Sequence, residues 1–155
     1  MKYLICLLTA LLLTSCGQQE EGSLSTGPGQ LPSETVKHRW YTQKQVNTGQ
    51  VIFNEHCLVC HGADGKGTVQ DWQTPLSNGK YPPPPLNGSA HTWHHDLPVL
   101  RRVITEGGQR LGGTMPAMGG VLTETEIDNI LAYITSLWPD EVYQRWASRF
   151  GYEKN

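Results

Sequence analysis

Cys57-Leu58-Val59-Cys60-His61 is the stretch of sequence that decides the fold. A Cys-x-x-Cys-His run is the attachment motif of a c-type haem. Two thiols at this spacing can each form a thioether to one edge of a porphyrin, and the histidine that follows can bind the iron. The motif therefore predicts one covalently bound haem c (iron), held by Cys57, Cys60 and His61.

Two other kinds of site share part of this motif. A Cys-x-x-Cys pair also occurs in thiol oxidoreductases and in zinc sites. A thioredoxin-like site should open a helix within a βαβ pattern, and the flanking sequence has no strand-rich pattern. A zinc site needs two more Cys or His ligands at short spacing, but the remaining cysteines, Cys6 and Cys16, lie within the first sixteen residues. Haem attachment is therefore favoured.

The start of the chain is typical of a targeting segment. Lys2 precedes an apolar run over residues 3–13, which is shorter than the about twenty residues that span a bilayer. The run ends in Leu13-Thr14-Ser15-Cys16 and resembles the lipobox of bacterial lipoproteins. The resemblance implies that residues 1–15 are a signal peptide and that Cys16 is lipidated, which would anchor an exported protein to a membrane, facing the periplasm. An ordinary signal peptide with an incidental cysteine is the alternative.

The segment after the lipobox is predicted to be a flexible tether. Residues 16–41 contain few apolar side chains and show no periodicity. Gly17 stands where lipoproteins retained in an inner membrane usually carry aspartate, which slightly favours the outer membrane if the cell is Gram-negative. The chain has 12 basic and 14 acidic residues and a formal net charge of −2, which argues against nucleic acid as a partner.

The region around the haem motif is predicted to be helical. A first helix should run from near Gln43 to the motif, with Thr42 as its N-cap. Gly49 lowers the stability of this helix by about 1 kcal/mol relative to alanine, and tight packing of another element against it would explain its presence. Tyr81 and the prolines 82–85 predict a rigid extended stretch. A middle helix is expected from about 97 to 106, capped by Asp96 and ended by glycines 107 and 108.

The last main helix has the clearest start signal. Thr123-Glu124-Thr125-Glu126 is a capping box. Apolar residues at 127, 130, 131, 134 and 137 follow at helical spacing, and Pro139 ends the pattern. Residues 140–155 predict a short helical extension. No strand pattern is visible, so the predicted fold class is all-α.

A glycine-rich loop between the middle and last helices supplies candidates for a second iron ligand. It contains Met115 and Met118. A methionine thioether is a soft ligand, and a His/Met pair raises the iron potential relative to two imidazoles. The residues alone leave alternatives open, because Met118 could replace Met115 as the ligand. A bis-histidine site is also possible, with candidates at His91, His94 and His95.

These features together resemble a class I c-type cytochrome, monohaem and His/Met-ligated, over about residues 43–138. The resemblance rests on the Cys57–His61 motif, the Met115-Pro116 loop and the capped helix after it. It implies a small class I fold in residues 42–139, with its N- and C-terminal helices crossing around one haem. The crossing would involve Gly49, Phe53 and Tyr133.

The resemblance also implies roles for site residues. Met115 would be the distal iron ligand, and a carbonyl in the 82–85 run would accept a hydrogen bond from Nδ1 of His61. Trp93 would lie near a haem propionate, with Arg101 and Arg102 as further candidates.

Two axial ligands leave no open position on the iron. The expected function is therefore one-electron transfer between Fe(III) and Fe(II), with a donor and an acceptor redox protein as partners, and not an enzyme activity. The alternatives are a cytochrome subunit of a dehydrogenase or terminal oxidase or reductase complex, and a haem-based gas or redox sensor.

Overall fold

The computed structural model describes residues 39–152. The predicted signal peptide, the lipidation site at Cys16 and most of the predicted tether lie outside this range. The described part contains five α-helices, which are α1 (Gln43–His56), α2 (Leu58–His61), α3 (Leu97–Glu106), α4 (Glu124–Ser136) and α5 (Asp140–Phe150). Three 3₁₀ turns, Ala63–Gly65, Thr92–His94 and Gln109–Leu111, lie between them. Apart from a single bridge between Tyr81 and Gly113, the described residues form no β-pairing, and the all-α prediction is confirmed.

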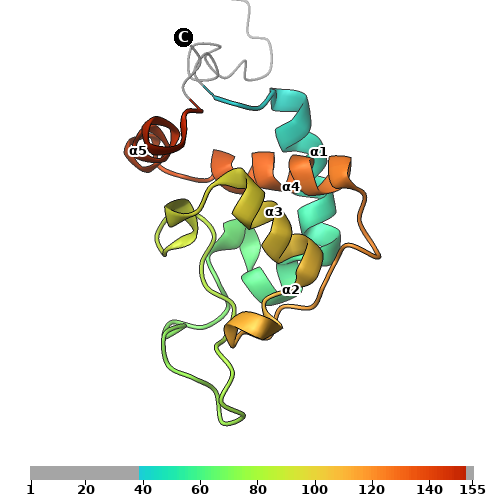
Figure 1. Ribbon diagram of the computed structural model, residues 1–155, viewed down its shortest axis with the longest axis vertical. Coiled ribbons are helices and arrows are strands. Elements are labelled where there is room, and N and C mark those ends of the chain that lie inside the picture. The colour runs from blue at the N-terminus through green and yellow to red at the C-terminus, as the bar shows by residue number, and fades with distance from the viewer. Residues whose placement is uncertain (1–38, 153–155) are drawn as a thin grey trace, which may run out of the picture. The chain divides into compact units, whose positions relative to one another are not determined.

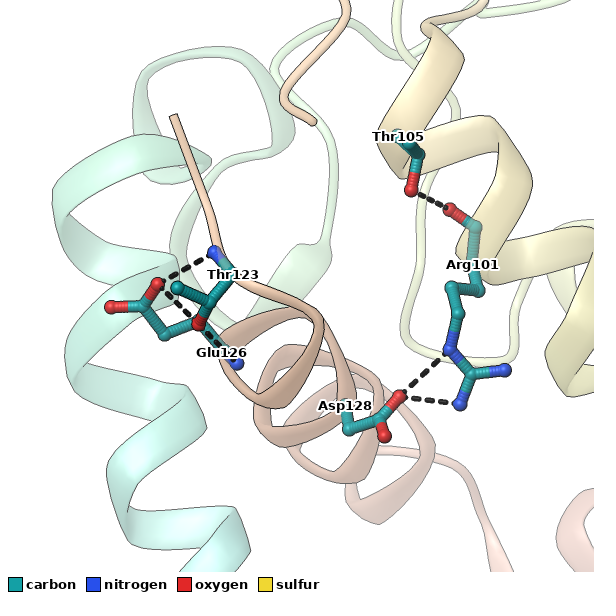
Figure 2. Close-up of polar contacts among 5 residues, drawn as sticks. All are labelled: Arg101, Thr105, Thr123, Glu126 and Asp128. Atoms are coloured by element: carbon teal, nitrogen blue, oxygen red, sulfur yellow. Dashed lines mark hydrogen bonds and ion pairs between the residues drawn. The ribbon is translucent and has the colours of Figure 1, made fainter. Parts of the chain in front are cut away.

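The main helices begin where the sequence predicts. Thr42 and Gln45 form a capping box at α1. Asp96 caps α3 by accepting a hydrogen bond of 3.0 Å from the amide of Val99. At α4 the amide of Thr123 donates to Oε2 of Glu126 over 2.8 Å, and Figure 2 shows the two residues closing the box. Each cap satisfies an amide that the first helical turn leaves without a partner.

The crossing of α1 and α4 forms the centre of the domain (Figure 1). Gly49 lies against the backbone of α4, where a Cβ atom would stand 1.8 Å from the carbonyl oxygen of Asn129. One turn further along α1, the rings of Phe53 and Tyr133 pack with centroids 5.2 Å apart. The missing side chain of Gly49 thus lets the two helices approach closely enough for their next turns to share one apolar core.

The C-terminal helix α5 contributes large side chains to the core. Tyr143 and Trp146 are fully buried, as is most of Trp138 just before the helix. Val142 and Phe150 are partly buried and pack against the same core. The extension is therefore an integral part of the fold.

Residues 39–41 belong to the packed domain. The amide of Trp40 donates to the hydroxyl of Tyr143 over 2.9 Å, and Nε1 of Trp40 donates to Oγ1 of Thr135 over 3.2 Å. Arg39 pairs with Asp140 at the start of α5 and stacks on the Tyr143 ring, 3.8 Å from its centroid. Arg39 and Trp40 therefore already contact the domain, which was predicted to begin at residue 42. Among residues 39–152, no helix is both long enough and apolar enough to cross a membrane.

Candidate haem site

A largely apolar cavity of about 400 Å³ lies between α2, the proline run, α3 and the loop before α4. This volume is within the range of small-molecule and cofactor pockets. A second cavity of about 70 Å³ adjoins it and shares His61, Leu100 and Met115 with it. Side chains of α1 and α4 line the smaller cavity, including Phe53, Ile130, Leu131 and Ile134. The two cavities together give a long apolar space that reaches the helix crossing.

His61 lines both cavities. Its ring is buried, and Nδ1 lies 3.3 Å from the carbonyl oxygen of Pro84. Because a carbonyl only accepts, this contact requires the proton on Nδ1 and leaves the lone pair of Nε2 for a metal. Burial lowers the pKa of His61, while the hydrogen bond to Pro84 opposes this shift. The net shift favours the neutral imidazole, the form that binds iron.

The two cysteines of the motif are held by a tight turn. The carbonyl of Cys57 accepts hydrogen bonds from the amides of Cys60 and His61, over 3.2 and 2.9 Å. Cys57 is half-buried and lines the smaller cavity, while Cys60 is exposed. Burial, with a smaller contribution from Cys60, raises the pKa of Cys57 to about 11. Both sulfurs are free, so neither is consumed by a disulfide.

A glycine allows the chain to leave this turn. Gly62 has a φ of +71°, and a Cβ there would lie 2.4 Å from the carbonyl oxygen of Gly67. The amide of Gly67 in turn donates to the carbonyl of His61 over 2.7 Å. The loop therefore folds back onto the motif and supports the buried histidine.

The two methionines occupy different places. Met115 lines both cavities, whereas Met118 lines only the smaller one. The carbonyl of Met115 accepts a hydrogen bond of 3.0 Å from Gly108, and the amide of Met118 donates over 3.0 Å to the carbonyl of Ile104. These bonds fix the loop against the end of α3. The structure thus brings Met115 together with His61 in the larger cavity.

The residues expected near a haem propionate do not line either cavity. Arg101 forms an ion pair with Asp128 of α4, as Figure 2 shows, and Arg102 is exposed. Trp93 packs on His94, and the guanidinium of Arg145 lies 5.8 Å from its ring centroid. Successive side chains of a 3₁₀ turn point about a third of a turn apart, so Thr92 can line the cavities while Trp93 faces α5.

Three residues that were not expected near a haem propionate line the larger cavity. Trp72, His91 and His95 line it. The sequence indicated the two histidines only as alternative iron ligands, and it gave no indication of Trp72. A tryptophan within a long polar loop was the one available signal, because no periodicity marks the segment.

The donor set fits a c-type haem. A buried neutral imidazole, a thioether side chain and a free thiol meet in or beside one apolar space. The imidazole and thioether suit iron, and apolar walls suit a porphyrin.

Comparison with known proteins identifies the family. Residues 44–134 match the family described as cytochrome c oxidase, cbb3-type, subunit III. The chain is 33% identical over 94 residues to the cbb3-type cytochrome c oxidase subunit FixP of Azorhizobium caulinodans, covering 57% of the chain and 28% of that protein. It is 31% identical over 96 residues to a thiosulfate dehydrogenase of Psychrobacter arcticus, covering 61% of the chain and 27% of that enzyme.

The chain thus spans less than a third of the length of either relative. No solved structure matches it. The family match covers more than half of the chain and includes the Cys57–His61 motif, the cavities' helices and the Met115 loop. The chain belongs to the cytochrome c family of cbb3-type oxidase subunit III, and its described domain is a cytochrome c domain that binds haem c covalently.

Proposed function

We propose that the protein is a monohaem one-electron carrier, anchored to a membrane and facing the periplasm. The observation that supports it best is the position of His61 and Met115, which line the same apolar cavity while Cys57 lines the adjoining one. When bound, the haem iron would supply reversible exchange of one electron. The chain's residues would hold it, exclude water and set its potential.

Each site residue has a defined role in this proposal. Cys57 and Cys60 would form the thioethers, and His61 and Met115 would bind the iron. The carbonyl of Pro84 keeps the proton on Nδ1 of His61 and fixes the ring, which makes Nε2 a better donor. The methionine ligand and the apolar walls favour the reduced state.

In this proposal the protein is an electron carrier and not an enzyme. With one imidazole and one thioether bound, the iron would have no site for a substrate, so redox change would require little rearrangement of the chain. Electron donor and acceptor proteins would be its partners. The predicted lipid on Cys16 would keep it at the membrane, with the outer membrane slightly favoured.

A second function is supported by the relatives and by one surface feature. The relatives are a subunit of an oxidase and a thiosulfate dehydrogenase. Val59, inside the attachment motif, is 83% exposed, and Leu58 beside it is also exposed. Apolar side chains at the attachment site could be covered by a permanent partner, which would make the protein a cytochrome subunit of a dehydrogenase or terminal oxidase complex.

The test uses the exported full chain. A pyridine haemochrome assay, with the protein concentration from amino-acid analysis, should give one haem per chain, and a redox titration should give a single one-electron wave. Carbon monoxide should leave the reduced spectrum unchanged. Absence of covalent haem would refute the proposal, and a prompt response to carbon monoxide would favour a sensor.

Two further measurements address anchoring and assembly. The wild-type chain should sediment with membranes, and a Cys16→Ser variant should appear in the soluble fraction with its haem intact. Equal distribution of the two proteins would contradict lipid anchoring. Co-purification of a partner in fixed stoichiometry after detergent extraction would support the subunit function instead of the solitary carrier.

A further inference from the structure

The larger cavity lacks the cations that usually meet a haem's carboxylates. A haem carries two propionates on the edge away from its thioether bonds. Cys57 lines the smaller cavity, so a haem joined to it would direct its propionates toward the larger one. None of the described residues that line the two cavities is lysine or arginine. Carboxylates that lose contact with water need hydrogen-bond donors, so other side chains of the cavity must supply them.

Three ring side chains in the larger cavity can donate hydrogen bonds. Trp72, His91 and His95 line it. The Trp72 and His91 rings stack with centroids 5.2 Å apart and planes 28° apart. The rings of His91 and His95 meet edge to face, with centroids 5.8 Å apart. We call His91 and His95 the imidazole cluster, and Trp72 flanks it.

The rest of the fold holds this cluster in place. Nε1 of the buried Trp146 donates to the carbonyl of His95 over 2.7 Å, which ties the segment to α5. The hydroxyl of Thr92 donates to the carbonyl of Pro85 over 3.3 Å, which ties it to the proline run. The amide of His94 donates to the carbonyl of His91 over 2.9 Å. Hydrogen bonds to α5 and to the proline run therefore fix the segment that carries the two histidines.

The cluster has no anionic partner within the described structure. Burial lowers the pKa of His91, and the neighbouring His95 and His94 lower it further. The nearest carboxylates in sequence are engaged elsewhere, because Asp71 accepts hydrogen bonds from Thr74 and Asp96 caps α3. On α5, Arg145 faces Trp93. No ion pair joins His91 or His95 to any residue in 39–152.

We propose that His91 and His95 bind the haem propionates, with Trp72 flanking them, and that this contact couples proton binding to haem reduction. The inference rests on the proposed function, since it assumes a haem in the cavity. Reduction removes one positive charge from the iron, so a nearby cation is bound more tightly in the reduced protein. The reduction potential should therefore fall as the pH rises through the range in which the histidines lose their protons.

The test is the reduction potential of the full haem-loaded chain between pH 5 and 9. The wild type should show a potential that falls with pH, and the double variant His91→Gln and His95→Gln should lose most of that dependence. His94→Gln is the matched control, because His94 belongs to the same segment but, unlike His91 and His95, lines neither cavity. This variant should keep a potential that falls with pH by as much as in the wild type, with the fall shifted to higher pH because His94 no longer lowers the pKa of His91.

Two outcomes would overturn the proposal. One is a wild-type potential that does not change over this range, a result that requires no variant to fold. The other is a double variant with an undiminished pH dependence. Haem content and the ferric sulfur-to-iron charge-transfer band, measured on each sample, separate this question from the proposed function. Absence of the haem or of the band in the wild type would contradict the proposed carrier function. A normal band with a reduction potential that does not change with pH would contradict only the proposed role of His91 and His95.

Discussion

The substitution Gly49→Ala tests the close approach of α1 and α4. A Cβ at residue 49 would lie 1.8 Å from the carbonyl oxygen of Asn129 and 3.0 Å from the amide nitrogen of Ile130. The first distance is about 1.5 Å shorter than an ordinary contact between carbon and carbonyl oxygen. Both atoms are backbone, so no rotamer change relieves the overlap and the helices must separate.

The two energetic effects of this substitution have opposite signs. Alanine is better than glycine in a helix by about 1 kcal/mol. Overpacking costs about 1–3 kcal/mol where side chains can adjust, and a clash with backbone should reach or exceed the upper end. The net expectation is a loss of at least about 2 kcal/mol in the free energy of unfolding.

Urea denaturation of the haem-loaded chain, followed by far-UV circular dichroism and by Soret absorbance, measures this loss. With an m-value of about 2 kcal/mol/M, the midpoint should fall by about 1 M. Gly120→Ala is the matched control, since a Cβ there has no neighbour within 4 Å. The control should change stability by less than about 0.5 kcal/mol. A Gly49→Ala protein as stable as the wild type would refute the helix-crossing argument.

Three further predictions concern stability. Burial raises the pKa of Tyr41 to about 12, so the folded state keeps a proton that the unfolded chain releases near pH 10. About 1 kcal/mol of stability should be lost between pH 8 and 11, and urea titrations of Tyr41→Phe at both pH values should show a smaller loss. Thr123→Ala removes the cap of α4 and should cost about 1 kcal/mol, with an unchanged midpoint as the contrary result. Asp128→Asn breaks a half-exposed ion pair with Arg101 and should cost less than about 1 kcal/mol in thermal unfolding. A larger cost would mean that the pair is more important than its exposure suggests.

The sequence predicts the helices because local rules govern them. The caps at Thr42, Asp96 and Thr123 use side chains that lie within three residues of their partners. Gly49 could also be interpreted, since a glycine inside a helix calls for a packing reason, and the structure places α4 against it. The haem motif needs only five consecutive residues, so it too was visible without any knowledge of the fold.

The environment of the cavity could not be predicted in the same way. Trp72 comes from a long loop without periodicity, and only the folded chain brings it onto His91. Arg101 appeared available as a cation, but its partner Asp128 lies 27 residues away on another helix. Trp93 faces α5 because of a short 3₁₀ turn that the sequence did not indicate. Each of these positions depends on contacts between segments far apart in the chain.

The central claim is that His61 and Met115 would bind the iron of one covalently attached haem. The most direct test is the ferric sulfur-to-iron charge-transfer band in Met115→Ala and Met118→Ala, measured on proteins with equal haem content by pyridine haemochrome. The account predicts that Met115→Ala abolishes the band and that Met118→Ala, which lines only the smaller cavity, retains it. A band that survives in Met115→Ala and disappears in Met118→Ala would contradict the assignment, and a wild type without the band would contradict His/Met ligation altogether.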